Sequence, residues 1–245
     1  MLGLFNKKKH SFNFSCIGAD MHGHWLSGLD DGAQSIDDSI LIIQSLQQLG
    51  YKKLIATPHI ISDYYPNTPQ NIRLKLNEIK KVAAQHQLTI QLEIAAEYMV
   101  DFEFEQMLQN NQPLLSFANN FVLIEMSYLA ASENIQNVLL LLNSKGYTPI
   151  LAHPERYKYC NHSIQYFQQL KSLGCLLQLN LLSLTGYYGS YEKKFATALL
   201  QQNMIDFLGT DVHHAQHLNA LQSITTNKNC YQLLQNYSFK NSLLL

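Results

Sequence analysis

Apolar runs alternate with amphipathic stretches along most of this chain. Each run is rich in Leu, Ile, Val or Phe and is bounded by polar or turn-forming residues, a pattern typical of buried strands. The pattern predicts strands over residues 14–19, 53–56, 89–95, 121–124, 148–152, 176–179 and 206–208. Several of these are almost continuously apolar, as expected of parallel strands that are covered on both faces.

The segments between the strands predict helices with recognisable ends. Ser35 is expected to cap the first helix, and Asp38 three residues later completes an imperfect capping box. Apolar positions then recur at the helical period until Gly50, a residue type that commonly follows a helix end. The same arrangement recurs before Gly146 and Gly174, and a predicted strand follows each glycine within a few residues.

Polar residues at the ends of the predicted strands distinguish between two folds. Repeated strand–helix units form either an open doubly wound sheet or a closed barrel. An open sheet concentrates its site at one switch point, whereas a barrel collects functional residues from many strand ends at its C-terminal face. Six strand ends carry His, Asp or Glu, so the sequence favours an α/β barrel.

These polar residues occur in six short segments. The segments are DMHGH at 20–24, TPH at 57–59, AE at 96–97, IE at 124–125, LAHPER at 151–156 and GTDVH at 209–213. The candidate metal ligands that they supply are His22, His24, His59, Glu97, Glu125, His153, Asp211 and His213. Separate strand ends that present only imidazole and carboxylate groups predict a polynuclear metal site at one mouth of the barrel.

The spacing within the segments suits such a site. Residues i and i+2 of a strand face the same side, so His22 and His24 can both point toward the barrel axis, as can Asp211 and His213. Mixed imidazole and carboxylate ligation suits Mn²⁺, Fe²⁺, Zn²⁺ or Co²⁺, and carboxylates can bridge ions about 3.5–4 Å apart. A bridged cluster activates water and clamps phosphoryl oxygens, so it favours hydrolysis of a phosphate ester.

Residues beside the candidate ligands are interpreted individually. Asp30 and Asp31 both follow His24 closely enough to fold back over the site, and spacing does not choose between them. Asp20 and Glu155 are expected to face away and to support the ligands instead of binding metal. The remaining histidines, which are interpreted as core or surface residues, are His10, His86, His162, His214 and His217.

Arginine occurs only at Arg73 and Arg156. Arg156 follows the His-Pro-Glu segment, so it is expected to lie beside the metals, where its planar fork could hold phosphate oxygens. The sequence has no Cys-x₅-Arg of a cysteine-dependent phosphatase, no G-x-S-x-G, no P-loop and no G-x-G-x-x-G. The metal site and Arg156 therefore remain the only candidate chemistry in the sequence.

Size and charge narrow the function classes further. The 245 residues are enough for one large domain, which we expect over residues 14–245 after an N-terminal tail at 1–13. The formal net charge of −1 does not indicate the basic surface that is typical of nucleic-acid-binding proteins. No apolar run approaches the length of a membrane span, and no signal peptide is visible, so a cytoplasmic protein without membrane insertion is expected. The four cysteines lack a CxxC spacing and are interpreted as free thiols.

The motifs together resemble the polymerase and histidinol phosphatase (PHP) superfamily, and more closely its bacterial capsular and exopolysaccharide tyrosine-protein phosphatases. The stretches that carry the resemblance are DMHGHWLSGLDDGA from Asp20, IATPH to His59, AAEY at Glu97, LIEMS at Glu125, ILAHPERY at His153 and LGTDVH at Asp211. His-x-His alone marks the superfamily. Its combination with D-D-G, I-E-x-S and H-P-E-R indicates the tyrosine phosphatase branch.

The resemblance implies a distorted seven-stranded barrel of the PHP type with three divalent metal ions, most often Mn²⁺, with Fe²⁺, Zn²⁺, Co²⁺ or Mg²⁺ as alternatives. It also implies Asp31, and not Asp30, as a ligand, and Arg156 as the residue that holds the phosphate. The implied ligand sets are His22, His24, Glu97 and Asp211 for one metal, Glu97, Glu125 and His153 for the second, and Asp31, His59 and His213 for the third.

The resemblance further implies a substrate and a partner. The substrate would be the phosphotyrosine tail of a bacterial tyrosine kinase that controls capsular or exopolysaccharide synthesis and export. Loop tyrosines on the same rim could shape a mouth for phosphotyrosine by ring stacking, with Tyr187 and Tyr188 as the leading candidates. The other loop tyrosines on that rim are Tyr64, Tyr65 and Tyr191.

Three alternative functions remain open from the sequence. The nearest is a small-molecule phosphoesterase of the same superfamily, such as a histidinol-phosphate phosphatase. A second hypothesis is a non-catalytic, metal-binding regulator that binds a kinase tail. The intact ligand set argues against it. A nuclease or polymerase-associated role is disfavoured, because no basic groove or polymerase region is visible.

Overall fold

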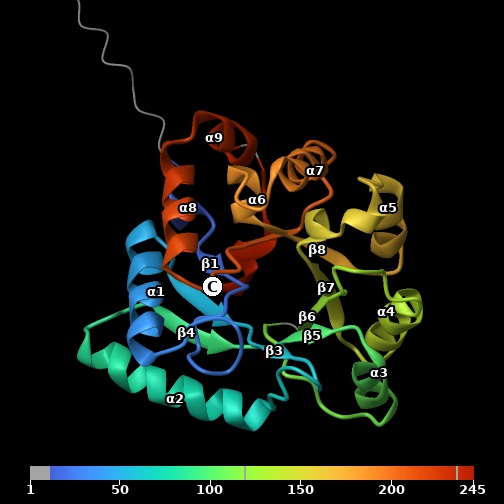
Figure 1. Ribbon diagram of the computed structural model, residues 1–245, viewed down its shortest axis with the longest axis horizontal. Helices are drawn as coiled ribbons and strands as arrows, with labels where there is room; N and C mark the ends of the chain where they lie inside the picture. Colours follow the sequence, from blue (N-terminus) through green and yellow to red (C-terminus); the bar gives the residue numbers. More distant parts are fainter. Residues whose placement is uncertain (1–11, 119, 236) are drawn as a thin grey trace, which may run out of the picture.

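The computed structural model describes residues 12–118, 120–235 and 237–245 of the chain, and within them parallel strands form a distorted α/β barrel surrounded by helices (Figure 1). The strands are β1 (Ala19–Asp20), β2 (Lys53–Ala56), β3 (His59–Ile60), β4 (Gln91–Ile94), β5 (Glu97–Met99), β6 (Phe121–Glu125), β7 (Thr148–Ala152), β8 (Leu176–Asn180) and β9 (Phe207–Gly209). The fold class expected from the sequence is therefore confirmed.

The strands form two parallel sheets, and the second sheet continues the strand order of the first. The first sheet runs β1-β2-β4, and the second runs β3-β5-β6-β7-β8-β9. The pairing register does not change between them, because Ala56 pairs with Ile94 and His59 pairs with Glu97. Pro58 lies in the gap and has no N–H to donate, which interrupts the ladder locally. The segments β2/β3 and β4/β5 therefore act as two interrupted strands of a seven-stranded arrangement.

Backbone hydrogen bonds link the last strand to the first beyond their C-terminal ends. Gly23 forms an isolated parallel bridge with Val212. The Asp211 N–H donates to the carbonyl of His22 (2.7 Å), and the His24 N–H donates to the carbonyl of Val212 (2.9 Å). These bonds hold the segments after β1 and β9 side by side, which brings their candidate ligands together.

A side chain from the C-terminus links the same two strands at the opposite end. Asn241 lies in a short 3₁₀ helix, Lys240–Leu244, and is fully buried. Its amide group donates to the carbonyls of Ala19 (2.9 Å) and Leu208 (2.7 Å), and its oxygen accepts from the Leu208 N–H (2.9 Å). Figure 1 shows the C-terminus close to β1. The end of the chain thus completes the barrel floor between β1 and β9.

Helices cover the outside of the strands (Figure 1). They are α1 (Ile36–Leu49), α2 (Pro69–Gln85), α3 (Phe102–Gln109), α4 (Ile135–Ser144), α5 (Ile164–Ser172), α6 (Leu181–Thr185), α7 (Ser190–Gln201), α8 (Ala215–Thr226) and α9 (Lys228–Leu234). The predicted start of α1 is confirmed, because Ser35 and Asp38 form a reciprocal capping box. Gly50 follows α1 with a φ of 110°, a left-handed conformation that favours glycine.

The N-terminal part of the predicted first strand is wrong. Residues 14–19 were expected to be extended, but Phe14–Cys16 form a 3₁₀ helix and β1 contains only Ala19–Asp20. The Asn13 side chain accepts a hydrogen bond from the Ser15 N–H, which caps this turn. Gly18 then has a φ of 79°, which turns the chain into β1.

Most of the predicted tail, residues 1–11, lies outside the described residues. Phe12 is buried, and its N–H donates to the carbonyl of Thr225 (2.9 Å), so this residue already packs on the domain. Among the described residues, no helix combines the length and apolar character that crossing a membrane requires.

Candidate metal centre

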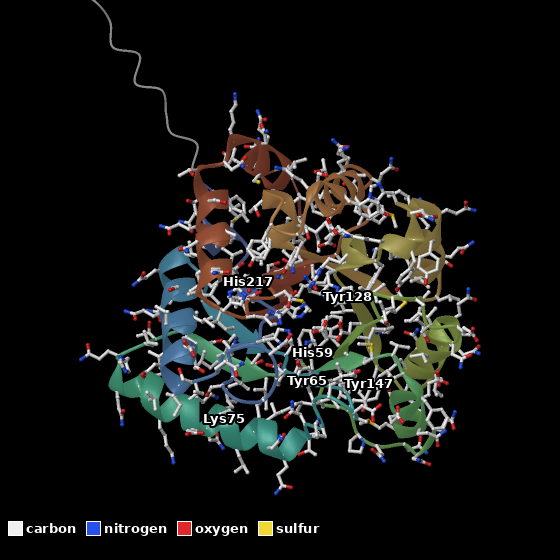
Figure 2. All side chains as sticks on the ribbon, in the orientation of Figure 1. His59, Tyr65, Lys75, Tyr128, Tyr147 and His217 are labelled. Atoms are coloured by element: carbon white, nitrogen blue, oxygen red, sulfur yellow. The ribbon has the colours of Figure 1, made fainter. Side chains whose placement is uncertain are left out.

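The predicted ligands gather at the C-terminal ends of the strands, around one cavity. His59, Glu97 and Glu125 lie in β3, β5 and β6, while the others follow β1, β7 and β9 or lie in the loop after β1. Figure 2 shows His59 and Tyr128 near the centre of the molecule, where these strand ends meet. We call the following nine residues the carboxylate–imidazole cluster: His22, His24, Asp31, His59, Glu97, Glu125, His153, Asp211 and His213.

The deepest part of the cluster joins His22 and His24 to two carboxylates. The Nε2 atoms of the two histidines lie 3.2 Å apart. The His22 Nε2 lies 3.0 Å from Glu97 Oε2 and 3.3 Å from Asp211 Oδ1, and the His24 Nε2 lies 3.3 Å from each of the same two oxygens. All four side chains are buried. Two ring nitrogens and two carboxylate oxygens therefore converge on one point.

Glu97 also reaches the next part of the cluster through its second oxygen. The His153 Nε2 lies 3.2 Å from Glu97 Oε1 and 3.9 Å from Glu125 Oε2. The His59 Nδ1 lies 3.1 Å from Glu125 Oε1 and 3.4 Å from Glu97 Oε2. Glu97 thus presents Oε2 to His22, His24 and His59 and Oε1 to His153, an arrangement that suits a bridging carboxylate.

The outermost part of the cluster contains Asp31, His59 and His213. Asp31 Oδ1 lies 3.5 Å from the Nε2 atoms of both His59 and His213. Asp30 has a different place, because its Oδ2 accepts from the His24 Nδ1 (2.7 Å) and from the His59 N–H (3.0 Å). Asp31 therefore faces the cluster, while Asp30 supports the far side of the His24 ring.

Four compact sets of side chains offer donor atoms that all lie within 4.8 Å of one another. The sets are His24, Asp31, His59 and His213; His22, His24 and Asp211; His22, Glu97 and His153; and His59, Glu97 and Glu125. The sets overlap at His22, His24, His59 and Glu97. They agree with the three sets implied by the resemblance in placing Asp31 with His59 and His213, but they also bring His24 to that group.

A layer of polar side chains behind the cluster orients it. The His22 Nδ1 lies 2.8 Å from Gln178 Oε1, so its Nε2 faces the cluster. Asn180 Nδ2 donates to Asp211 Oδ2 (2.8 Å). Asp20 accepts from the N–H and hydroxyl of Thr210 (2.9 and 2.6 Å), which holds the segment that leads into Asp211. Such partners fix the tautomer and direction of metal-binding side chains.

Glu155 also turns away from the cluster and is fully buried. Its Oε1 accepts from the Asn180 N–H (3.0 Å) and the Ser183 hydroxyl (2.7 Å). Burial raises its pKa to about 7. The supporting positions expected for Asp20 and Glu155 match these contacts.

The backbone adopts left-handed conformations at two members of the cluster. His153 has a φ of 34° and Asp211 a φ of 49°, values that are uncommon for residues with a side chain. Gly32 permits another close approach, because a Cβ atom there would lie 2.0 Å from the carbonyl oxygen of His24. The loop that carries Asp30 and Asp31 can therefore fold over His24 only with glycine at position 32.

Charges within the cluster are strongly coupled. Burial raises the pKa values of Glu97 and Asp211, but neighbouring imidazoles, foremost His22, outweigh it and hold both well below their usual range. Burial lowers the pKa of His24, but the Asp30 carboxylate and further hydrogen bonds raise it well above its usual range. Ionised carboxylates thus surround the imidazoles, which is the donor set that a divalent cation would meet.

Two buried polar atoms in the cluster lack a hydrogen-bond partner, which bears on whether the cluster fits metal ions. Glu97 Oε1 and His59 Nδ1 are buried and make no hydrogen bond within the described part of the chain. The His59 Nδ1 approaches Glu125 Oε1 but lacks the alignment that a hydrogen bond requires. Buried polar groups without a partner are costly, and a bound cation would satisfy both atoms. The donor types, their convergence and these atoms all fit divalent ions such as Mn²⁺, Fe²⁺ or Zn²⁺.

Seven of the nine cluster residues, all except His22 and His24, line a cavity of about 390 Å³. Arg156 lines the same cavity, and its Nη1 donates to Asp211 Oδ2 (3.0 Å). Tyr188 also lines the cavity, whereas Tyr187 packs edge-on against Tyr188 (centroids 5.2 Å apart) and is not part of the lining. Tyr65 stacks on His59, with ring centroids 5.5 Å apart. The cavity thus combines cation-binding donors with an anion-binding guanidinium.

The other two loop tyrosines lie elsewhere. Tyr64 is 77% exposed. Tyr191 donates from its hydroxyl to the carbonyl of Lys158 (3.1 Å) and packs on His162. Neither contributes to the lining of the cavity.

Sequence reasoning missed several residues of the site. Tyr128 lines the cavity, and its hydroxyl lies 3.3 Å from the His153 Nε2. His217, interpreted as a core or surface residue, is buried and also lines the cavity, where its Nδ1 accepts from the His213 N–H (3.2 Å). Tyr128 follows Glu125 in the loop after β6, so its position was a signal. For His217 in α8 the sequence offers no comparable signal.

Comparison with known proteins identifies the family. YwqE of Bacillus subtilis (strain 168), a tyrosine-protein phosphatase, is 29% identical over 200 residues, which cover 82% of this chain and 79% of YwqE. This chain also resembles a crystal structure from a study of YwqE and of CpsB of Streptococcus pneumoniae, which are metal-dependent tyrosine phosphatases. The TM-score is 0.75 and the sequence identity 28%, and the match covers 93% of this chain and 94% of the other.

A more distant structure shares the fold alone. Histidinol phosphate phosphatase of Lactococcus lactis has a TM-score of 0.50 and 15% identity, with 90% of this chain and 94% of that chain covered. The family model for capsular polysaccharide synthesis, CpsB/CapC, matches residues 18–238, a range that contains every member of the carboxylate–imidazole cluster. This chain therefore belongs to the CpsB/CapC family of capsular polysaccharide synthesis.

Proposed function

We propose that this protein is a metal-dependent phosphatase that hydrolyses phosphotyrosine in proteins. The observation that carries the proposal is the convergence of nine imidazole and carboxylate residues, seven of which line the same cavity as Arg156. Cation-binding residues and a guanidinium in one cavity suit a phosphate monoester, because both can neutralise its oxygens. Family membership and the tyrosine-protein phosphatase YwqE among the relatives support the same reaction.

We further propose that the cluster holds three divalent ions, with Mn²⁺ as the preferred metal. Fe²⁺, Zn²⁺, Co²⁺ and Mg²⁺ are compatible alternatives, because the donors are imidazoles and carboxylates. The proposed ligand sets are His22, His24, Glu97 and Asp211 for the first ion, Glu97, Glu125 and His153 for the second, and Asp31, His59 and His213 for the third. The two-sided position of Glu97 supports its role as a bridge between the first two ions.

Divalent ions held in this way would supply Lewis-acid chemistry that neutralises phosphoryl oxygens and activates water. The protein's own residues prepare the site. Gln178 and Asp30 hold the rings of His22 and His24 so that their Nε2 atoms face the centre. Arg156 is proposed as the catalytic residue that binds the phosphate, because it lines the cavity beside Asp211.

We propose Tyr187 and Tyr188 as residues that shape the mouth for a phosphotyrosine side chain. Tyr188 lines the cavity, and the ring of Tyr187 packs edge-on against it. We expect alanine at either position to raise the KM for a phosphotyrosine peptide. An unchanged KM in both variants would contradict this role.

The proposed substrate is the phosphotyrosine tail of a bacterial tyrosine kinase that controls capsular or exopolysaccharide synthesis and export. The family's link to capsular polysaccharide synthesis supports this partner. The same proposal places the protein in the cytoplasm, where it would act without membrane insertion.

The test compares rates on two substrates with the same metal-loaded protein. We expect kcat/KM for a phosphotyrosine peptide to exceed that for histidinol phosphate by at least about a hundredfold, because only the peptide extends beyond the cavity to use rim contacts. The reverse preference would identify a small-molecule phosphoesterase. No turnover of either ester, in protein that binds the metals, would support a binding protein instead of an enzyme.

A further inference from the structure

Arg156 contacts the rings of two tyrosines. Its Cζ atom is 4.6 Å from the ring centroid of Tyr128 and 4.2 Å from that of Tyr188. Tyr128 comes from the loop after β6, Arg156 from the turn after β7, and Tyr188 from the loop between α6 and α7. Three loops that are separate in sequence therefore meet at this guanidinium.

Most N–H groups of the guanidinium make no hydrogen bond within the described part of the chain. Its side chain is 21% exposed, and within the described part of the chain its one hydrogen bond joins Nη1 to Asp211 Oδ2 (3.0 Å). A guanidinium donates only in its own plane, so rings on its faces remove no donor. The remaining N–H groups are available to an anion in the cavity that Arg156 lines.

Contacts with the metal side of the cavity fix each ring in turn. The Tyr188 hydroxyl accepts from Asn180 Nδ2 (3.2 Å), and the same amide donates to Asp211 Oδ2 (2.8 Å). The Tyr128 ring stacks on His153, with centroids 5.6 Å apart, and its hydroxyl lies 3.3 Å from the His153 Nε2. These contacts hold the Tyr128 ring against His153 and link the Tyr188 ring to Asp211 through Asn180.

We propose that Tyr128 and Tyr188 are positioning residues that clamp Arg156, so that its free edge faces a phosphoryl group held at the cluster. This inference rests on the proposed function. The side of the Tyr188 ring that faces Arg156 is already occupied, and Tyr187 and His217 approach the same ring edge-on (centroids 5.2 and 6.4 Å away). The clamp accordingly acts through Arg156 and not through ring stacking on the substrate.

Inorganic phosphate separates these two modes of action, because it has no ring to stack. The test measures its inhibition constant against a phosphotyrosine peptide for Mn²⁺-loaded wild type, Y128L, Y188L, Y128F, Y188F, R156A and the double variant R156A/Y188L. We expect leucine at either position to weaken phosphate inhibition about five- to thirtyfold, the range of a desolvated cation–π contact. Phenylalanine keeps the ring and should restore tight inhibition. Metal content should stay at the wild-type value in every variant.

The double variant shows whether the tyrosines act through Arg156. In the R156A background, Y188L should weaken phosphate inhibition no further, because the clamped group is gone. An equal loss with and without Arg156, unchanged inhibition in both leucine variants, or loss of metal from them would overturn the clamp. If phosphate inhibits R156A as strongly as it inhibits wild type, Arg156 does not bind the phosphate as the proposed function requires. That outcome is distinct from failure of the clamp.

Discussion

Strained backbone at two residues decides where the cluster converges. His153 and Asp211 have φ values of 34° and 49°, and both side chains then approach Glu97 or the histidines that contact it. Left-handed conformations cost about 1–3 kcal/mol each for residues with a side chain, so they persist only where the surroundings enforce them. Asn180 and Tyr128 are part of those surroundings, because they contact Asp211 and His153 directly.

Glu97 is the residue whose loss should affect the site most. Its Oε2 lies 3.0 Å from His22 Nε2, and its Oε1 lies 3.2 Å from His153 Nε2, so it contacts more than one part of the cluster. We expect Glu97→Ala to lower bound Mn²⁺ by at least one ion per protein and to reduce kcat by at least about a hundredfold, as loss of a ligand exceeds loss of a supporting group. Metal analysis and a peptide assay check this, with Arg156→Ala as the control that keeps its metals. Full metal content in the Glu97 variant would contradict the bridging role.

Protons should compete with metal ions at His59. Burial and the neighbouring His24 lower its pKa, but interactions with Asp31 and Glu125 outweigh them and raise the pKa to about 10. The metal-free protein therefore carries a proton on His59 at pH 7, and a metal ion must displace it. We expect Mn²⁺ affinity to rise about tenfold per pH unit for each proton displaced between pH 6.5 and 8. Calorimetry of Mn²⁺ binding in two buffers of different ionisation enthalpy measures the number of protons released. Binding of Mn²⁺ without proton release would contradict the prediction.

At the scale of elements, interrupted strands and tight loops carry the chemistry. Pro58 breaks the ladder between β2 and β3, and residues 95 and 96 separate β4 from β5. Each interruption is followed at once by a member of the cluster, His59 or Glu97. The loop after β1 then folds back so that its Asp30 carboxylate reaches the ring of His24.

Gly32 makes this return of the loop possible. We expect Gly32→Ala to displace the loop from His24, because the added Cβ would lie 2.0 Å from a backbone oxygen. Mn²⁺ affinity should fall by about tenfold or more, since Asp30 would no longer orient the His24 ring. Gly146→Ala is the matched control, because Gly146 has a φ of 79° but open space around it. Equal Mn²⁺ affinity in the two variants would show that the close approach is not needed.

At the scale of the whole molecule, the C-terminus completes the barrel. Asn241 bonds to Ala19 in β1 and to both backbone groups of Leu208 in β9. No other side chain in the described part of the chain hydrogen-bonds to both of these strands. The two strands lead directly into His22 and Asp211, so the floor and the metal centre share the same pair of strands.

Asn241 should therefore matter for stability. We expect Asn241→Leu to lower the free energy of unfolding by about 2–4 kcal/mol, because three buried backbone groups lose their partner. Urea denaturation monitored by circular dichroism measures the change. Ser242→Ala, at an exposed neighbouring position, is the control and should stay within about 0.5 kcal/mol of wild type. An equal effect of the two substitutions would contradict the role of Asn241.

Much of this architecture could be predicted from the sequence, because the strands are short apolar runs with clear boundaries. The bounds of β2 and β7 match the prediction, and each predicted ligand belongs to the carboxylate–imidazole cluster. Local patterns could not predict what depends on distant partners. The amides of Gln178 and Asn180 lie in the strand without ligands and acquire their role only through His22 and Asp211.

Other misses follow from the same limit. The choice between Asp30 and Asp31 depends on how the loop folds over His24, which spacing alone does not encode. The strand predicted from residue 14 failed because a local cap by Asn13 outweighed the apolar character of the run.

One measurement tests the central claim most directly. Protein stripped of metal by a chelator is assayed for phosphate release from a phosphotyrosine peptide, before and after addition of Mn²⁺. We predict that the stripped protein is inactive and that Mn²⁺ restores turnover as about three ions bind per chain. Phosphate release from fully stripped protein would contradict the metal-dependent mechanism. Rebinding of the ions without any turnover of the peptide would contradict the assignment as a tyrosine phosphatase.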